Sequence, residues 1–401
     1  MQYLIFILKS AVEDFRRNKV RTILTSLGIL IGVASVVLLM AFGLGLKKYI
    51  QNQFESLGTN LLRVVPGKIL SGGSFRTGPS ALGGVSFDEK DLAAIRKIKD
   101  AKYVIPVFSK SITVSSGGTS ELTDLYASSS DIFLGLNLKS KYGSVFSKSD
   151  VENRSKVAVI GPKIAQKIFG DEGVAVGRSI KVEKQNLKVI GVLEAKGGGF
   201  GGPDLDSFVY VPYTTAQVFN PNKKFIALIV KADDNANLNT VSDEITARLL
   251  KRYKENDFSV IQQAELLSAI SSIFSILNSI LIAIAAISLV VGGIGIMNIM
   301  YVSVVERIRE IGIRRAIGAT SKDILLQFLA EAVILSLLGG FLGLTLSFLI
   351  VFIIQRFFPA YINLSSVFIA LGVSSVIGVV FGVFPAKRAS DLSPIEAIRY
   401  E

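Results

Sequence analysis

The polar residues that could carry chemistry concentrate in one short segment, 305–320, which reads VERIREIGIRRAIGAT. Glu310 and Arg314 stand four residues apart, in the order that favours an ion pair on a helix. The apolar residues recur at helical spacing and Gly318 is the expected C-cap, so the segment predicts a short amphipathic helix. The residues expected on its apolar face are Ile308, Ile311 and Ala316, with Ile313 and Ile317 adjoining. One face would meet the membrane or a partner, and the other would make charged contacts, with Glu310 and Arg314 exposed toward a partner. A solvated connector is the alternative.

The rest of the sequence contains few residues that could form a catalytic or metal-binding site. The chain contains no Cys and no His, which excludes disulfides, thiolate metal sites and the usual general base. Gly197, Gly199 and Gly202 have the GxGxxG spacing of a dinucleotide loop, but Pro203 follows where a helix should begin. A cation at Asp204 and Asp206 is possible in principle, and a solvated loop is favoured. No Walker A motif is present, so we expect no ATP hydrolysis by these residues, no catalytic site, no cofactor and no metal.

Long apolar runs must position the charged segment. One run covers 23–46, and three more cover 273–300, 324–354 and 367–384. Each is long enough for a helix that crosses a bilayer, which takes about 20 apolar residues. More than two hundred mostly polar residues separate the first run from the second. The expected fold is an α-helical membrane protein with four transmembrane helices and a large extracytoplasmic α+β domain inserted between helices 1 and 2.

The basic residues give the orientation. They cluster before the first run, in the loop after the second and after the fourth, whereas the loop over 355–366 holds only Arg356. Lys and Arg mark cytoplasmic loops, so both termini and the charged segment are expected inside. The first run is longer than the apolar core of a signal peptide, which favours an uncleaved anchor. Topology and surface solvation then explain the net charge of +12, and no nucleic-acid partner is expected.

The patterns divide the chain into successive parts. These are an amphipathic cytoplasmic helix (1–21), the first span (22–46), a helical stalk (47–58), the extracytoplasmic domain (59–262), a stalk with the second span (263–301), a cytoplasmic loop (302–322), the third span (323–354), an outer loop (355–366), the fourth span (367–385) and a cytoplasmic tail (386–401). Within the outer domain, about 59–115 and 223–262 form one subdomain and about 116–222 are inserted. Strands are expected near 103–108 and 111–114, and a helix capped by Ser86 with Glu89.

Small residues at four-residue spacing predict close helix packing in the membrane. Intramolecular packing and a dimer contact are both compatible with this pattern. The candidate packing residues are Gly28, Gly32, Gly292, Gly295, Gly339, Gly343, Gly378 and Gly382. Glu331 is the one carboxylate inside the apolar runs, and it is a functional group, a side chain that snorkels to the cytoplasmic interface, or the partner of a loop arginine. A continuous polar path is missing, which argues against an ion channel or proton-driven carrier.

The segment 309–319, REIGIRRAIGA, strongly resembles the cytoplasmic signature of FtsX-like permease domains, and of MacB-type ABC transporter permeases in particular. Three further segments resemble the same family. They are NKVRT with GILIGV over 18–33, LGTN with VPG over 57–67, and PA, AS and SPIEAIRYE over 385–401. Together with the layout of the apolar runs, the resemblance covers the whole chain.

The resemblance implies a stand-alone permease subunit, without an ATPase domain, of the mechanotransmission type. It implies a homodimer in a bacterial inner membrane, a separate ABC ATPase subunit seated on a coupling helix at 306–318, and a membrane-fusion adaptor as in MacB systems. The outer domain would have a porter-like part and an inserted part, and the substrate for efflux would be a drug, peptide or lipid. The residues that would couple to the ATPase are Glu306, Arg307, Arg309, Glu310, Ile311, Gly312, Arg314, Arg315 and Gly318.

Other members of the superfamily have different functions, which are alternatives for this chain. A Lol-type protein would release lipoproteins, and an FtsX-type protein would regulate cell-wall hydrolases, although FtsX usually has a smaller outer domain. A membrane-anchored scaffold is a non-transport alternative. The sequence identifies no substrate.

Overall fold

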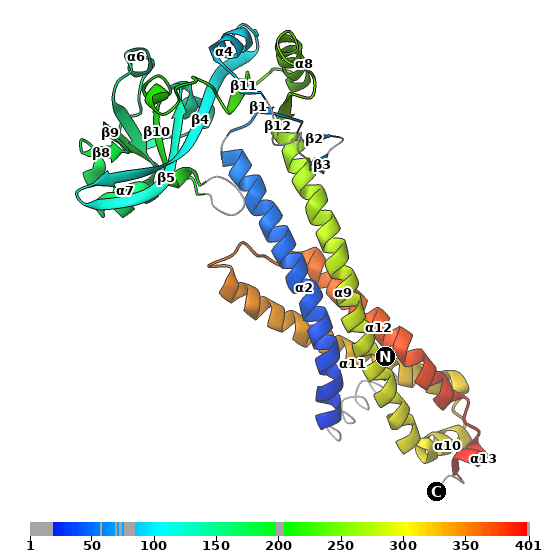
Figure 1. The fold of residues 1–401 in the computed structure, drawn as a ribbon. Coiled ribbons are helices and arrows are strands. Elements are labelled where there is room, and N and C mark those ends of the chain that lie inside the picture. The colour runs from blue at the N-terminus through cyan, green and yellow to red at the C-terminus, as the bar shows by residue number, and fades with distance from the viewer. Residues whose placement is uncertain are drawn as a thin grey trace. The chain divides into compact units, whose positions relative to one another are not determined.

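The computed structural model describes residues 19–56, 58–68, 70–71, 74–75, 85–197 and 204–398. Residues 1–18 of the amphipathic helix expected over 1–21 lie outside the described residues. Gly199 and Gly202 lie outside them as well. The chain forms two compact units. Of the described residues, those up to Tyr49 and those from Ile273 onward form one unit, and those within Ile50–Ser272 form the other (Figure 1).

Four helices of the described chain are long and apolar enough to cross a membrane. They are α2 (Lys19–Ser56), α9 (Gln263–Glu306), α11 (Ser321–Ile354) and α12 (Leu364–Ser390). Two short helices, α10 (Ile308–Ala316) and α13 (Pro394–Ile398), complete the first unit. The expected class, four apolar helices with an α+β domain between the first and the second, is confirmed.

The helix ends follow local chemistry. Thr320 begins α11 with a capping box, in which its hydroxyl accepts from the Asp323 N–H and the Asp323 carboxylate accepts from the Thr320 N–H. The α12 helix continues through Pro385 to Ser390, beyond the end expected at 385. Packing against neighbouring helices lets a membrane helix tolerate such a proline.

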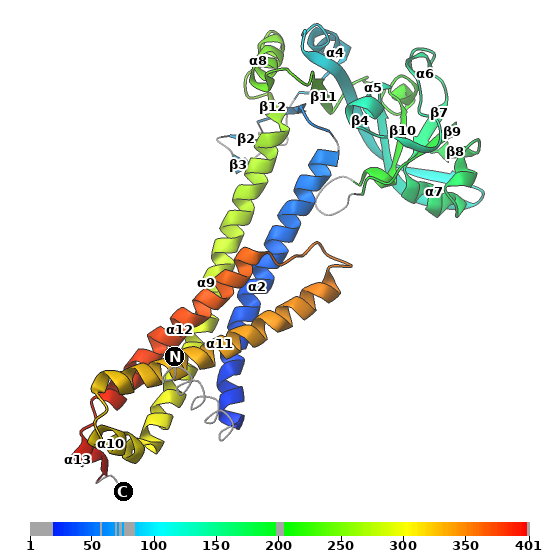
Figure 2. The same cartoon turned by 180° about the vertical axis from the view of Figure 1, so that it is seen from behind.

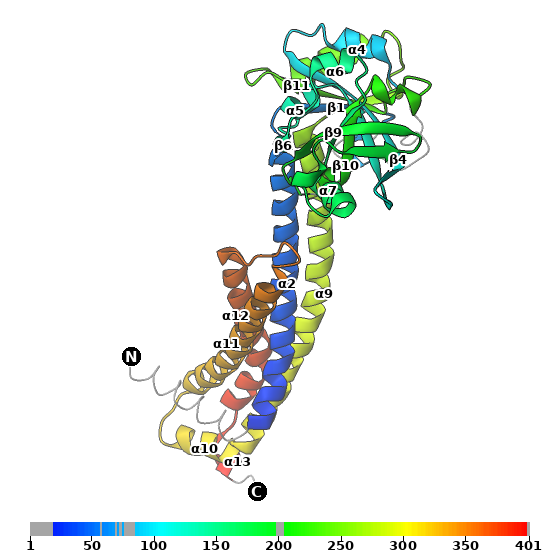
Figure 3. The same cartoon turned by 90° about the vertical axis from the view of Figure 1, so that its left-hand side faces the viewer.

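The four helices share one apolar core. The α2 and α9 helices lie side by side, as do α11 and α12 (Figure 3). Ile29 and Val37 of α2, Ile296 of α9 and Phe328 of α11 are each at most 1% exposed within this core. Serines inside the core bond to backbone carbonyls, as where Ser347 donates to the Gly343 carbonyl at 2.8 Å. Such bonds satisfy polar groups that lipid cannot.

The second unit is built on a single sheet. Within the described residues, nine strands follow the order β12-β1-β11-β4-β5-β10-β7-β9-β6, and β8 pairs with β4 and β9. The pairs β10–β5 and β7–β9 are parallel and the other pairs are antiparallel. The bounds are β1 (Leu61–Pro66), β4 (Ala101–Ser116), β5 (Thr119–Ser128), β6 (Ser140–Gly143), β7 (Val157–Ile160), β8 (Ser179–Val182), β9 (Gln185–Leu193), β10 (Phe208–Pro212), β11 (Ala227–Ala232) and β12 (Phe258–Gln262). The short strands β2 (Leu70–Ser71) and β3 (Ser74–Phe75) pair with each other in antiparallel orientation.

Helices cover this sheet in two places. The α4 (Glu89–Ile95) and α8 (Leu238–Leu249) helices lie next to each other (Figure 2) and pack on one face of β1, β11 and β4. The α7 helix (Pro162–Phe169) packs on the part of the sheet that contains β5 and β9. The remaining short elements are α5 (Asp131–Gly135), α6 (Lys148–Glu152), η1 (Gly173–Ala175), η2 (Leu205–Ser207) and η3 (Thr215–Val218).

The strand β4 differs from expectation. Two strands, near 103–108 and 111–114, were expected, and the structure has one strand, Ala101–Ser116. Its first half pairs with β11 up to Val107, and its second half pairs with β5 from Phe108 onward. The pairing with β5 begins at the residue after the pairing with β11 ends. The strand is therefore unbroken, and it belongs to both parts of the sheet.

The start of α4 also differs. The predicted cap, Ser86 with Glu89, is wrong: Asp88 is the N-cap and Asp91 is the third helical residue. The Asp88 carboxylate accepts from the Lys90 N–H at 2.9 Å, and Asp91 accepts from the Asp88 N–H at 2.9 Å. Phe87 forms a β-bridge with Phe225, which holds the residues before Asp88 in an extended conformation.

Candidate functional site

The charged segment forms α10, as predicted. Ile308 and Ile311 are buried, at 9% and 1% exposed, and Gly312 is buried beside them. The other residues of the predicted apolar face do not pack within the chain: Ala316 is exposed, and Ile313 and Ile317 are 50% and 81% exposed. Gly318 follows the C-cap residue Ile317 with a φ of +112°, a backbone conformation that glycine adopts without strain.

Arg314 ties α10 to the third long helix. Its Nη1 donates to Gln327 Oε1 at 2.8 Å, and its Nη2 donates to Glu310. Gln327 is buried, and its amide donates in turn to Glu331 Oε1 at 3.4 Å. The expectation that Arg314 lies on an exposed partner face is therefore wrong, since its guanidinium points toward α11. Glu310 keeps about half of its side chain exposed, at 51%.

Glu331 is 4% exposed, and Arg307 Nη1 lies 3.5 Å from its Oε1. A buried carboxylate is costly unless it is paired and hydrogen-bonded. The pairing with a loop arginine, one of the three alternatives for Glu331, is thus the one that the structure shows. Arg307 and Arg314 reach the same buried polar chain, through Glu331 and Gln327.

Arg315 fastens α10 to the end of the fourth long helix. Its Nη1 donates to the carbonyls of Ser390 at 2.6 Å and Leu392 at 3.1 Å. Carbonyls at a helix C-terminus lack intrahelical partners and attract cations. The α13 helix packs against α10 beside this contact.

The predicted coupling residues, which lie on α10 or next to its ends, therefore fall into two groups. Arg307, Ile311, Gly312, Arg314 and Arg315 are buried or turn toward the other helices. Glu306, Arg309, Glu310 and Gly318 are exposed. The exposed side also includes Ile313, Ala316 and Ile317, so it carries both charges and apolar side chains. Such a surface suits a protein partner.

Most of the predicted packing glycines bring helices of the same chain together. A methyl carbon on Gly28 would lie 3.0 Å from Gly292 Cα, and one on Gly32 would lie 2.6 Å from Leu289 Cδ2, so α2 and α9 leave no room for side chains there. A methyl carbon on Gly343 would lie 2.8 Å from the Leu30 carbonyl oxygen. Small residues permit this approach, and dispersion contacts then stabilise the helix pair.

Further glycines lie between α11 and α12. A methyl carbon on Gly382 would lie 2.5 Å from Ala332 Cβ, and one on Gly378 would meet Ser336 and Val333. Gly339 is buried and Gly295 is half-buried. The intramolecular alternative therefore holds for Gly28, Gly32, Gly292, Gly343, Gly378 and Gly382.

Asp204 and Asp206 have structural partners. Asp206 is 4% exposed and accepts from the backbone N–H groups of Lys196 at 2.7 Å and Gly197 at 3.0 Å. Burial raises the pKa of Asp204, but hydrogen bonds from Lys163 and Ser207 outweigh it and leave the pKa below its ordinary value. A solvated loop is therefore the wrong description for Asp206. Among the described residues, no cluster of acidic side chains could hold a metal ion.

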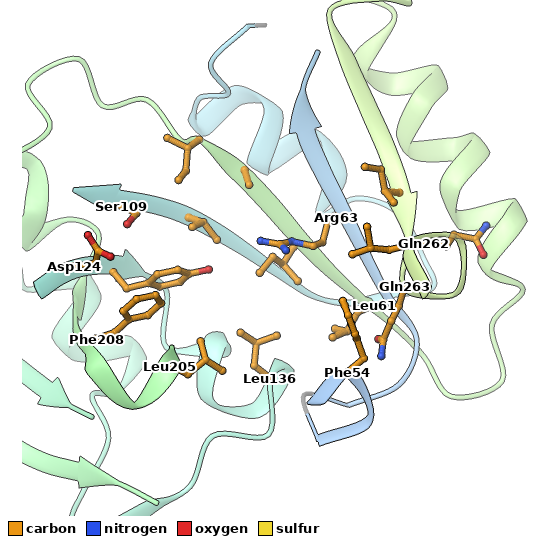
Figure 4. Close-up of a pocket in the computed structure, with 17 residues that line it drawn as sticks. Phe54, Leu61, Arg63, Ser109, Asp124, Leu136, Leu205, Phe208, Gln262 and Gln263 are labelled. Carbon is orange, nitrogen blue, oxygen red and sulfur yellow. The ribbon is translucent and has the colours of Figure 1, made fainter. Parts of the chain in front are cut away.

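A pocket in the unit Ile50–Ser272 has no counterpart in the sequence analysis. It has a volume of about 330 Å³ and mostly apolar walls (Figure 4). Arg63 extends across its middle, between Phe208 and Leu205 on one side and Phe54 and Gln263 on the other. The signal that could have found it is a single arginine in the otherwise apolar strand LLRVV.

Two family models match the chain. The MacB-like periplasmic core domain matches residues 22–248, and the FtsX-like permease C-terminal domain matches residues 282–394. The macrolide export ATP-binding/permease protein MacB of Bdellovibrio bacteriovorus is 38% identical, over 98% of this chain and 61% of that protein. The pyoverdine export ATP-binding/permease protein PvdT of Pseudomonas entomophila is 35% identical, over 96% of this chain and 58% of that protein. The chain thus spans about 60% of the length of these curated relatives.

Among solved structures, the periplasmic region of MacB from Actinobacillus actinomycetemcomitans is similar to the chain. The match has a TM-score of 0.47 and 22% identity, and it covers 54% of this chain and 95% of that one.

Proposed function

Because the chain belongs to the family that joins a MacB-like periplasmic core domain to an FtsX-like permease domain, we propose that it is the permease of an ABC exporter of the mechanotransmission type. The chain is a multi-pass membrane protein, and its α+β periplasmic domain is inserted between the first and second of the four long helices. The proposed work is to convert ATP hydrolysis in an ABC ATPase into movement of that domain.

The observation that carries this proposal is the division of α10 into a fixed side and an exposed side. Arg314 and Arg315 attach the helix to α11 and to the end of α12, and Ile311 is buried in the shared core. A partner that pushes on the exposed side would therefore move the long helices rather than a loose loop. This favours a coupling role over a solvated connector.

The long helices supply a route for the movement. The α2 helix is continuous as far as Ser56, and α9 is continuous from Gln263. A continuous helix transmits a displacement along its axis, whereas a flexible linker absorbs it. Substrate would be handled by the periplasmic domain, since the apolar runs of the sequence lack a continuous polar path. Their one carboxylate, Glu331, is paired with Arg307.

The proposed partners are an ABC ATPase in a separate subunit, a second copy of this chain and a membrane-fusion adaptor. In support of the first, the relatives are named as ATP-binding/permease proteins. In support of the second, α9 presents a row of exposed apolar residues that would face lipid or a second copy. These residues include Ile276, Ile280, Ile284, Ile287 and Val291. We propose that both termini and α10 are cytoplasmic, as the distribution of basic residues predicts.

The proposed substrate class is a small amphipathic molecule, because the named relatives export macrolides and pyoverdine. Affinity purification of the tagged full chain from its native membrane, followed by mass spectrometry, tests the proposal. Recovery of an ABC ATPase with a membrane-fusion adaptor would support export. Recovery of an ATPase with lipoproteins or a cell-wall hydrolase would move the function to the Lol or FtsX type. No ATPase, under conditions that keep control complexes intact, would contradict the transporter function and favour a scaffold.

A further inference from the structure

The pocket of about 330 Å³ lies on the sheet face opposite α4 and α8. Arg63 of β1 is directly opposite Ile229 of β11 and Ile261 of β12, so the three side chains share this face. The part of the domain that includes β5, β10, α5 and η2 forms the facing wall. The volume falls at the lower end of the range that small-molecule sites occupy, roughly 300–1,000 Å³.

The walls are apolar except at a few points. Leu61, Leu136, Ile229 and Ile261 are each at most 7% exposed and present hydrocarbon to the space. Phe208 stacks on Tyr126 with ring centroids 5.4 Å apart, which gives one wall a flat aromatic surface. An apolar body would lose hydrated surface by entering this space, and aromatic bodies would also stack.

Arg63 is the cation among the lining residues. Its side chain is exposed, and within the described part of the chain it makes no hydrogen bond and no ion pair. By contrast, Arg252, Arg314 and Arg315 each bond to carboxylates or carbonyls. A guanidinium that has no partner within the described chain keeps its donors available for charge-assisted hydrogen bonds to an anion.

The groups around Arg63 support an anionic ligand. Burial raises the pKa of Tyr126, while the neighbouring Arg63 charge lowers it less, so the hydroxyl stays protonated and can donate. Asp124 is the anion in the lining, and Ser111 donates to its Oδ1 at 2.6 Å. Figure 4 shows Asp124 beside Ser109 at the edge of the pocket, away from Gln263. Gln263 carries a buried Oε1 that has no hydrogen-bond partner among the described residues, and a donor on a ligand would satisfy it.

We infer that this pocket binds a small amphipathic organic anion, with its acidic group on Arg63 and Tyr126 and its apolar body against the leucines, isoleucines and Phe208. The binding itself does not depend on the proposed export function, whereas the identification of this anion as cargo does. Phe54 near the end of α2 and Leu266 near the start of α9 also line the pocket. The bound anion therefore touches the ends of both helices that we propose to carry the movement.

Photoaffinity labelling of the full chain in lipid nanodiscs tests the inference. The probe is 4-(trifluoromethyl-diazirinyl)benzoate, and the matched probes are its uncharged benzyl alcohol and its cationic benzylamine. Peptide mass spectrometry locates the label, which separates the pocket from lipid-facing helices. The expected result is saturable labelling of pocket residues by the benzoate, at least fivefold above either matched probe, and competition by naphthalene-2-carboxylate.

Variants sharpen the test. Arg63→Gln should weaken benzoate labelling roughly ten- to hundredfold, the range expected for a lost charge-assisted hydrogen bond. Lys188→Gln removes one charge from an exposed position of β9 and should change nothing. Leu136→Trp fills the pocket without altering charge and should also abolish labelling, so the test does not depend on the arginine variant alone. A melting temperature is measured for each.

Equal labelling by the three probes, or unchanged labelling in Arg63→Gln, would overturn the inference. A chain that recruits an ATPase but takes no label would overturn the pocket inference alone. A chain that takes the label in the pocket but recruits no ATPase would support the anion site and contradict the proposed export function.

Discussion

Arg314 of α10 donates a hydrogen bond of 2.8 Å to Gln327 of α11, across a turn in the chain. Gln327 is 6% exposed and bonds to Glu331, so an arginine of the short helix is joined to a carboxylate buried among the long helices. This relationship makes α10 part of the helical unit. It also separates the residues that hold α10 in place from those that remain available to a partner.

Truncation of Arg314 should destabilise the helical unit. Arg314→Ala leaves the buried Gln327 amide without its donor, and the loss of a hydrogen bond to a charged group costs about 1.5–3 kcal/mol. Calorimetry of the full chain in nanodiscs should show a lower melting temperature for this unit. An unchanged melting temperature would mean that the contact does not hold α10.

Charge reversal on the exposed side of α10 should impair the coupling to the ATPase and leave the stability of the helical unit almost unchanged. Arg309→Glu should change stability by no more than about 0.5 kcal/mol, because the side chain is exposed. It should nevertheless weaken stimulation of the partner ATPase several-fold. Lys322→Glu makes the same charge change at an exposed position of α11 and serves as the control. Equal effects from both variants would count against a specific role for α10.

The pair Arg307–Glu331 should show strong coupling. Removal of one partner, as in Arg307→Ala, leaves a buried charge and should cost about 3–5 kcal/mol. The double variant Arg307→Ala with Glu331→Gln should recover part of that loss. A double-mutant cycle by calorimetry measures the coupling, and strictly additive losses would contradict the pairing.

Gly28 should tolerate no large side chain. Gly28→Leu would force α2 and α9 apart where a methyl carbon already lies 3.0 Å from Gly292 Cα, and overpacking costs about 1–3 kcal/mol. Gly372→Leu is the matched control, because a methyl carbon at that glycine of α12 has no atom of another described helix within 4 Å. Equal melting temperatures for the two variants would disprove close packing at Gly28.

The periplasmic domain should lose stability in acid through Asp88. Hydrogen bonds from Arg252, and then from Lys224, hold the pKa of Asp88 well below its ordinary value of 3.8 despite the opposing effect of burial. A depressed folded pKa stabilises the fold above the unfolded pKa, and this stabilisation is lost as pH falls below about 3.8. Asp88→Asn keeps a good N-cap and should flatten the dependence of the melting temperature on pH in that range. A wild-type slope retained in this variant would contradict the assignment.

The sequence was sufficient for features that depend on local composition. Uninterrupted apolar length predicted α2, α9, α11 and α12, and the spacing of glycines predicted which faces pack closely. It could not show that Arg314 points inward, because an i,i+4 pair with Glu310 is compatible with either orientation until α11 is in place. The position of Arg63 in a pocket could not be predicted either, because it also depends on tertiary contacts. Its environment comes from β11, β12, η2 and the ends of two helices, which are far apart in the chain.

The most direct test of the account uses cross-linking from α10. The chain has no cysteine, so Ile313→Cys places a single attachment point for a maleimide–benzophenone reagent on the exposed side of the helix. Phe352→Cys, at a 66% exposed apolar position of α11, is the control. The account predicts an adduct between position 313 and an ABC ATPase in native membranes, and none from position 352. An ATPase that co-purifies with the chain but forms no adduct from position 313 would contradict the proposal that α10 is the coupling helix.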